Sequence, residues 1–588
     1  MHNKIQLHLS QRWLQLAVVL LVSSAQATPL RAQPVSPTLL PPPRPTIPQA
    51  PPAPLPLPPQ NNLLQPSTPS TPGSESLPSR IESTITVKQF RFIGNTVFSS
   101  RRLAKLLVRY TNKPITFAKL LQARNAVAEL YINNGYITSD ALIPANQTFQ
   151  QGIITIQVVE GRLERIEVRG VRRLSRNYVL ERLRLAASKA LNRNRLLEAL
   201  QLLQLNPLIK NISAKLSAGT SPNTSVLEVQ VTEAKPFSTQ LILDNNRPPS
   251  VGSFERGVQL NQANLLGLGD GLSVGYTNTD GTDNVNALYT LPINPRNGTL
   301  SFSYGANWSR VIVSPFNALK ISANYRNYDL TLRQPLVQTP SQEFALGFVG
   351  SRRESDTKFL GTSEFASLIS PGADNRGRTR ISALRFFQEW TKRNKSSVLA
   401  ARSQFSLGVG ALDATIHRSA PDSRFFSWQG QGQWARLLAP DTLLVVRGDL
   451  QLASRPLVAL EQFGLGGIET VRGYAESYLL TDNAVFGSIE LRLPIFRAPR
   501  GGAVLQLVPS FDIANGWNNS ASSSSQQQSS NTSNASNTLA SIGAGLRLQL
   551  GNNLSVRFDW GHPLINNSFR KRTWQENGLY FSVQYNPF

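Results

Sequence analysis

The sequence predicts two small α+β domains followed by an all-β transmembrane barrel of about 16 antiparallel strands. Three observations lead to this fold class. A strand–helix–helix–strand–strand (βααββ) pattern occurs twice between residues 84 and 234. Alternation of apolar and polar residues then replaces the helical period from residue 237 to 588. No apolar run past the N-terminus reaches the roughly 18 residues of a membrane-spanning helix, so a membrane domain must be a barrel.

Composition narrows the possible chemistry. The chain has 588 residues, a net charge of +25, no cysteine and four histidines. Without cysteine there is no disulfide, thiolate metal site or cysteine nucleophile. His2 and His8 fall in the leader, which leaves His417 and His562, far apart in the sequence, for base or zinc chemistry. We therefore expect no enzyme activity, no metal and no cofactor.

Two segments precede the first βααββ pattern. Residues 1–27 have the features of a signal peptide: a basic start, an apolar core at 14–22 and the cleavage site Ala25-Gln26-Ala27. Residues 28–80 are rich in proline, which favours extended polyproline II. We expect an exported chain with a proline-rich spacer that forms no packed domain. A retained anchor helix and a ligand for a proline-reading module are the alternatives.

The two βααββ units, 84–161 and 162–234, are internal repeats. The first opens with FRFIGNTVF and the second with IEVRGVRRL, so that Gly94 corresponds to Gly170 at the end of an alternating strand. Two stretches with helical periodicity follow in each unit, the first of them capped by Ser100 in the first unit. Both units close on alternating strands, ITIQVVEG and LEVQVTEA.

Residues 237–588 alternate as a lipid-facing barrel requires, in segments such as LSFSYGANW and LLVVRGDLQL. A soluble β-sandwich is the alternative. Short connections at 267–271, 292–298 and 551–553 take turns with long polar loops at 354–376, 455–483 and 516–537. In such barrels the short turns face the periplasm and the long loops face outward.

Two stretches of the first unit carry a family resemblance. GYITSDALIPANQ (135–147) and QGIITIQVVEG (151–161) resemble the Gly-Tyr, Pro-x-x-Gln and Glu-Gly signatures of POTRA domains. Two such units before a barrel resemble the TpsB transporters of two-partner secretion, the haemolysin secretion/activation (ShlB/FhaC/HecB) family. The resemblance implies an outer-membrane transporter whose periplasmic POTRA domains recognise an unfolded, exported TpsA-like polypeptide, which then passes through the barrel.

A four-residue motif late in the chain resembles the most diagnostic motif of this superfamily. It consists of Val471, Arg472, Gly473 and Tyr474. In the family this motif lies at the tip of the long loop between the eleventh and twelfth strands, which folds back into the lumen. The resemblance implies that the arginine anchors the loop. An ordinary exterior loop is the alternative.

Family members carry an F-x-D-x-G pattern on the thirteenth strand, whose acid pairs with that arginine. The matching stretch here runs from Ser510 to Ala514, so the first and last positions differ while Asp512 is kept. The resemblance implies Asp512 as the anchor partner. The terminal Phe588 resembles the aromatic signal that the barrel-assembly machinery reads.

The partners follow from charge and location. Residues 162–195 hold eleven basic and three acidic residues, which favours an acidic or extended client polypeptide, and a free sheet edge could add a client strand. A solvated helix face is the alternative. We expect outer-membrane lipid around the barrel and no nucleic acid. A barrel-assembly factor is the main alternative function, and a passive porin is another.

Overall fold

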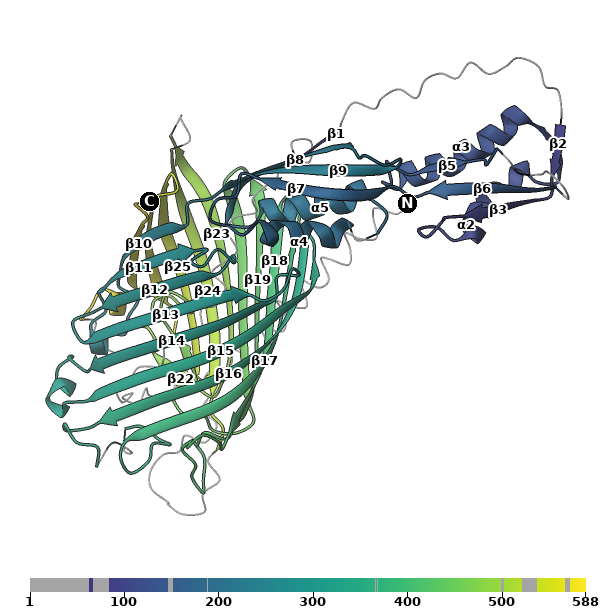
Figure 1. The fold of residues 1–588 in the computed structure, drawn as a ribbon. Helices are drawn as coiled ribbons and strands as arrows, with labels where there is room; N and C mark the ends of the chain where they lie inside the picture. Colours follow the sequence, from purple (N-terminus) through teal and green to yellow (C-terminus); the bar gives the residue numbers. More distant parts are fainter. Residues whose placement is uncertain are drawn as a thin grey trace, which may run out of the picture.

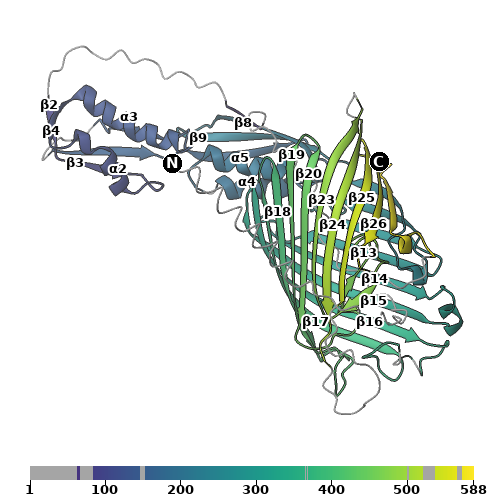
Figure 2. The ribbon, with the colours of Figure 1, turned by 180° about the vertical axis from the view of Figure 1, so that it is seen from behind.

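The structure is a computed structural model. It describes residues 63–66, 84–145, 147, 152–187, 189–364, 366, 369–498, 502–520, 537–565 and 572–587. Two small α+β units lie in sequence and extend away from one end of a large barrel (Figures 1 and 2). The predicted leader 1–27 and the terminal Phe588 lie outside the described residues.

The first unit has a three-stranded sheet of order β3-β6-β5, with β3 parallel and β5 antiparallel to β6. A separate pair, β2 and β4, lies beside it. Its elements are β2 (Thr84–Val87), β3 (Gln89–Ile93), α2 (Ser100–Leu106), η2 (Val108–Tyr110), β4 (Lys113–Thr116), α3 (Phe117–Asn133), β5 (Asp140–Leu142) and β6 (Ile153–Val159).

The second unit repeats this arrangement: β7 is parallel and β8 antiparallel to the central β9. Its elements are β7 (Arg162–Arg169), α4 (Arg176–Ala187), α5 (Arg193–Gln204), β8 (Ile209–Ala218) and β9 (Thr224–Glu233). Both units therefore contain the predicted order strand, two helices, two strands, and the first unit adds the β2–β4 pair, with β4 between its two helices.

Glycine is required at the same place in both units. Gly94 and Gly170 have φ values of 80° and 86°, a region that favours glycine. A Cβ on Gly94 would lie 2.2 Å from the carbonyl oxygen of Val158, and one on Gly170 would lie 2.2 Å from that of Val231. Both turns thus press directly on the central strand of their sheet, which explains why the repeat includes glycine here.

In both units, a glutamate at the end of the last strand caps the loop that follows the first strand of the sheet. The Glu160 carboxylate accepts hydrogen bonds from the backbone N–H groups of Thr96 (2.7 Å) and Val97 (2.8 Å). The Glu233 carboxylate accepts three, among them one from Leu174 N–H at 3.0 Å. This gives a structural reason for the Glu-Gly signature.

The helix start in the first unit lies one residue earlier than expected. Ser99, not Ser100, is the N-cap of α2, and its hydroxyl oxygen accepts a hydrogen bond from Arg102 N–H. The second helix of the unit, α3, is capped by Thr116 and is followed by Gly135 at φ 90°. Two adjacent serines both satisfy the sequence rule for a cap, so the pattern does not choose between them.

The proline-rich segment is not a spacer along its whole length. Within 28–80, strand β1 (Leu64–Pro66) adds to the sheet of the second unit in parallel with β8. The sheet order there is β1-β8-β9-β7. The expectation of no packed structure is therefore wrong for this stretch. Residues 60–65 contain no proline, so the backbone of Leu64 and Gln65 can donate hydrogen bonds, and Pro66 is the last residue of the strand.

Sixteen described strands close into one antiparallel barrel, in which β10 pairs with β27. The strands are β10 (Phe237–Asp244), β11 (Glu255–Ala263), β12 (Gly271–Asn278), β13 (Thr282–Pro292), β14 (Thr299–Arg310), β15 (Ser322–Gln338), β16 (Gln342–Lys358), β17 (Arg378–Arg393), β18 (Ser397–Val409), β19 (Phe426–Ala439), β20 (Thr442–Ala453), β23 (Asn483–Arg497), β24 (Ala503–Trp517), β25 (Asn537–Leu550), β26 (Leu554–Pro563) and β27 (Leu579–Tyr585). The predicted barrel is confirmed and the sandwich is excluded.

Apolar side chains point outward from the barrel strands, as in Phe348 and Leu384, which are 59% and 60% exposed. The three predicted short turns join β11 to β12, β13 to β14 and β25 to β26. The loop expected at 354–376 begins later, because β16 continues to Lys358 with polar side chains. Among the described helices, none has the length and apolar character needed to cross a membrane.

The second unit contacts the barrel at two of these turns. Arg182 Nε donates a hydrogen bond to Asn297 Oδ1 (2.8 Å), and Ser175 N–H donates one to the carbonyl oxygen of Gly267 (2.7 Å). The short turns therefore lie at the end of the barrel that carries the two units.

Candidate functional site: the lumen loop and its anchor

The long loop between the eleventh and twelfth barrel strands, residues 454–482, carries the VRGY motif. It contains a short antiparallel hairpin, β21 (Phe463–Leu465) paired with β22 (Leu479–Thr481). Gly466, Gly467 and Gly473 have φ values of 105°, 89° and 90°, which permits sharp turns. We call residues 471–474, at the end of this hairpin, the loop tip.

Arg472 of the loop tip lies against Asp512 on β24. Its Nε donates to Asp512 Oδ2 and its Nη2 to Asp512 Oδ1, both at 2.7 Å. The Arg472 backbone N–H also donates to Asp512 Oδ2, at 3.2 Å. Arg472 is 0% exposed and Asp512 1%. This two-pronged geometry matches a planar guanidinium to a carboxylate and is not available to lysine.

Two further carboxylates surround the same guanidinium. Arg472 Nη1 lies 3.2 Å from Glu490 Oε2 on β23 and 3.6 Å from Asp559 Oδ1 on β26. The hydroxyl of Ser488 donates to Asp512 Oδ1 at 2.6 Å and so fixes the carboxylate. One arginine therefore links the loop to three strands of the barrel wall.

Arginines of the wall balance these acids. Glu490 Oε1 accepts from Arg492 Nε and from Arg547 Nη2, each at 2.8 Å. Arg557 Nε donates to Asp559 Oδ2. The anchor is thus one member of an alternating network of charges and not an isolated ion pair. A buried charge is tolerated only when it is paired in this manner.

The rest of the loop tip is held by close backbone contacts. A Cβ on Gly561 of β26 would lie 2.5 Å from Gly473 N, so the wall needs glycine where the tip approaches. Gly473 N–H donates to the Tyr580 hydroxyl (2.9 Å), which donates to the carbonyl oxygen of Tyr474 (2.7 Å). Tyr474 in turn donates to the carbonyl oxygen of Ile565 at 2.9 Å.

The altered positions of the F-x-D-x-G pattern fit this packing. Ala514 is buried in one apolar cluster with Val471 and Tyr474. Ser510 lies two residues before Asp512 on the same strand, and its hydroxyl approaches Gly543 of β25. The structure thus brings Asp512 to the loop tip although the flanking residues differ from the family pattern.

A second tether lies at the base of the loop. The Glu461 carboxylate accepts from Arg385 Nη2 (2.7 Å) and Nη1 (3.1 Å) on β17, and from Arg353 Nη1 (3.1 Å) on β16. The Glu461 side chain is 5% exposed. Sequence reasoning missed this site. The available signal is that Arg353 stands in a polar stretch of its strand and Arg385 is a charged residue among apolar ones, but nothing links either residue to Glu461.

Beside the loop the lumen leaves a cavity of about 800 Å³. Charges of both signs line it, from side chains that alternate with the outward apolar residues. The charged lining residues are Asp244, Arg333, Glu343, Glu389, Arg402, Arg447, Asp449, Glu469, Glu490, Arg492, Arg547 and Arg557. A lining with so many charged side chains suits a hydrated polypeptide.

No group of His, Asp or Glu side chains within the described ranges has an arrangement suited to a metal ion. The His417 ring Nε2 lies 3.1 Å from the carbonyl oxygen of Gly372, and the His562 ring is tilted against the Trp560 ring, with 5.9 Å between the ring centroids. The two histidines are therefore in separate structural surroundings.

Two family models match the chain. The model "Haemolysin secretion/activation protein ShlB/FhaC/HecB" matches residues 223–548. The model "POTRA domain, ShlB-type" matches residues 85–161, which contain the first βααββ unit from β3 to β6. The first of these covers more than half of the chain.

Similar proteins agree with these matches. The heme/hemopexin transporter protein HuxB of Haemophilus influenzae (strain 86-028NP) is 21% identical over 479 residues, which are 79% of this chain and 81% of that protein. The structure of CdiB from Escherichia coli aligns with a TM-score of 0.67 at 20% identity, over 88% of this chain and 92% of that chain.

A structure of BamA from Haemophilus ducreyi lacking POTRA domains 1–3 aligns with a TM-score of 0.51 at 12% identity, over 86% of this chain and 100% of that chain. At these identities the structural likenesses show the fold alone, whereas the family model identifies the group. The chain therefore belongs to the haemolysin secretion/activation (ShlB/FhaC/HecB) family and is an outer-membrane transporter of two-partner secretion with its POTRA domains in the periplasm.

Proposed function

We propose that the chain captures one unfolded, exported polypeptide, its client, at the POTRA units and passes it through the barrel to the cell surface. The observation that supports this most strongly is the lumen loop. It fills part of the channel and is held by ion pairs and hydrogen bonds at its base and tip. Polar contacts of this kind can exchange with water, so the loop can leave its site without unfolding the wall.

The second unit provides the route from the periplasm to the barrel. Its exposed basic residues include Arg172, Arg173 and Arg176, which flank the Ser175 contact to the β11–β12 turn. The exposed cations favour an acidic or extended client, because long-range attraction raises the rate of encounter. By contrast, Arg165 and Arg169 pair with Glu167 within the unit.

Further partners follow from the barrel itself. We propose that the outward apolar side chains contact outer-membrane lipid and that Phe588 serves as the signal for the barrel-assembly machinery. We expect deletion of Phe588 to lower the amount of heat-modifiable barrel on a detergent gel while synthesis stays constant. An unchanged amount of heat-modifiable protein would contradict this role.

We also expect that residues 1–27 are removed on export, that the domain limits lie near 161 and 234, and that nucleic acid is not a partner.

The test of the proposed function compares the host with and without the chain. We expect one large polypeptide to disappear from the culture medium and to return with the wild-type chain, but not with Arg472→Ala at equal barrel level. That polypeptide is the client. A general fall in other outer-membrane barrels, with no change in the medium, would favour the assembly factor instead. The family match and the count of two βααββ units in the described chain favour secretion over that alternative.

A further inference from the structure

The edge of the second unit's sheet is occupied by the chain's own proline-rich segment. Leu64, Gln65 and Pro66 of β1 pair in parallel with residues 214–216 of β8. The Leu63 carbonyl oxygen accepts a hydrogen bond from Ala214 N–H at 2.8 Å. We call residues 63–66 the latch.

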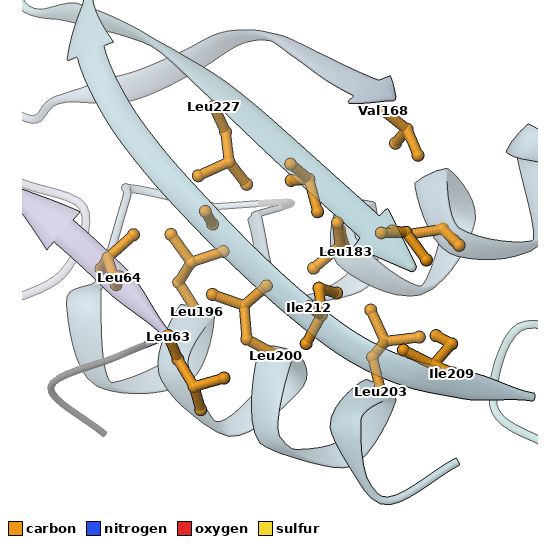
Figure 3. Close-up of a cluster of buried hydrophobic side chains, with 14 of the residues drawn as sticks. Leu63, Leu64, Val168, Leu183, Leu196, Leu200, Leu203, Ile209, Ile212 and Leu227 are labelled. Carbon is orange, nitrogen blue, oxygen red and sulfur yellow. The ribbon is translucent and has the colours of Figure 1, made fainter. Parts of the chain in front are cut away.

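The latch also contributes to the core of the unit. Leu63 and Leu64 are 3% and 7% exposed and belong to the same apolar cluster as Leu196 and Leu200 of α5. Figure 3 shows both side chains beside these leucines, at the margin of the core. The site under the latch is therefore an apolar notch next to a strand edge, which recognises an extended segment by backbone pairing and by apolar side chains.

The latch covers only part of the available edge. Strand β8 is 10 residues long, and β1 pairs with three of them. Lys210 and Lys215 of β8 are exposed and give this edge a positive charge. A free strand edge of this length pairs readily with another chain. The corresponding β5 of the first unit has only three residues, so the long edge belongs to the second unit.

The sequence of the latch explains why it binds here. Prolines recur through 41–59, and proline lacks the backbone N–H that a strand donates. The stretch QNNLLQ at 60–65 is free of proline and carries two adjacent leucines. It is therefore suited to hold the edge, while the short pairing permits its release.

We propose that the latch is a displaceable stand-in for the client, and that an extended client segment with apolar and acidic residues pairs with β8 in its place. This inference rests on the proposed function. Because the latch is tethered to the unit that it covers, it competes with any client at a high local concentration. Its release raises the fraction of units that are competent to bind, and the apparent affinity rises by the same factor.

The first test opens the latch in the full-length mature chain in detergent. The probe is a fluorescent peptide with the sequence of residues 60–68, QNNLLQPST. Leu63→Asp/Leu64→Asp should bind the peptide about tenfold more tightly than the wild type. The matched control is Leu39→Asp/Leu40→Asp, which makes the same change in another Leu–Leu pair of the proline-rich segment and should leave the affinity unchanged. Equal affinity of the opened variant and the wild type would overturn the proposal.

The second test closes the latch. The chain has no cysteine, so Gln65→Cys/Lys215→Cys offers one possible disulfide, between two residues in register. The oxidised variant should neither bind the peptide nor export the client, and reductant should restore both. The single-cysteine variants control for loss of the native side chains.

The outcomes separate the latch from the proposed function. Full export by the oxidised variant would refute the proposal that the client displaces the latch, but it would leave the proposed transport function intact. Absence of any exported polypeptide with the wild-type chain would refute the proposed function, and the peptide measurement would then decide on the latch alone.

Discussion

Removal of the Asp512 charge tests the loop anchor most sharply. Asp512→Asn keeps the shape of the side chain but takes away the charge that receives two 2.7 Å hydrogen bonds from Arg472. Breaking a buried ion pair by neutralising one partner costs about 3–5 kcal/mol. The carboxylates of Glu490 and Asp559 remain at 3.2 Å and 3.6 Å from the Arg472 guanidinium and still pair with it. We therefore expect a cost at the lower limit of this range, about 3 kcal/mol.

A cost of about 3 kcal/mol lowers the ratio of docked to undocked loop by roughly 150-fold. Arg472→Ala leaves Asp512 and Glu490 facing each other across the vacated site and should be at least as severe. Arg472→Lys keeps the charge but loses the planar fork, so it should recover little.

The assay uses Val471, which is 0% exposed in the docked loop. In this chain without cysteine, Val471→Cys is a single reporter whose labelling by a maleimide requires the tip to leave its site. Adding Asp512→Asn should raise the labelling rate by the same factor, roughly 150-fold. The control is Arg402→Ala, which removes a lumen arginine that pairs with Glu389 of the neighbouring strand. Unchanged labelling with Asp512→Asn, or simply additive effects of the Arg472 and Asp512 changes on labelling, would refute the coupling.

Three further outcomes are expected. Glu461→Gln should loosen the loop base, because two arginines lose their shared carboxylate; equal protease resistance of the loop in variant and wild type would argue against this tether. Burial alone would raise the pKa of Glu160, but the hydrogen bonds to its carboxylate outweigh burial and lower this pKa below the ordinary 4.5. The ionised Glu160 carboxylate therefore stabilises the folded unit fully above pH 4.5, and this stabilisation is lost as the pH falls through the lowered pKa of the folded state. Glu160→Gln should therefore speed amide exchange at Thr96 at pH 7, a difference that should vanish in acid; a constant difference would contradict it. Reversing Arg172 and Arg176 to glutamate should weaken client capture and its salt dependence, and equal capture at low salt would restore the view of a solvated face.

Much of the fold is predictable because its signals are local. Alternation at period two marks each barrel strand wherever one face meets lipid. The glycines Gly94 and Gly170 mark equivalent turns because no other residue fits there. The motif around Arg472 and the acid Asp512 are found by resemblance, and the structure places them in direct contact.

The remaining features depend on which distant residues meet, and local sequence does not determine this. Glu461 lies opposite Arg353 and Arg385 only because the loop folds across the lumen to β16 and β17. Nothing in the sequence around Gly561 shows that glycine is required there; the requirement arises because the loop tip packs against this position. The latch looks like a break in a proline-rich spacer, since its partner edge on β8 lies some 150 residues later in the chain.

The most direct test asks whether the client touches the lumen wall during export. A photo-crosslinking amino acid at Gln433, which lines the lumen cavity, is compared with one at Leu384, whose side chain is exposed on the outer face. With a client arrested in transit by a folded domain at its end, we predict adducts between client and barrel from Gln433 and none from Leu384. Adducts from Leu384 alone, or none from Gln433 while export continues, would contradict passage through this barrel.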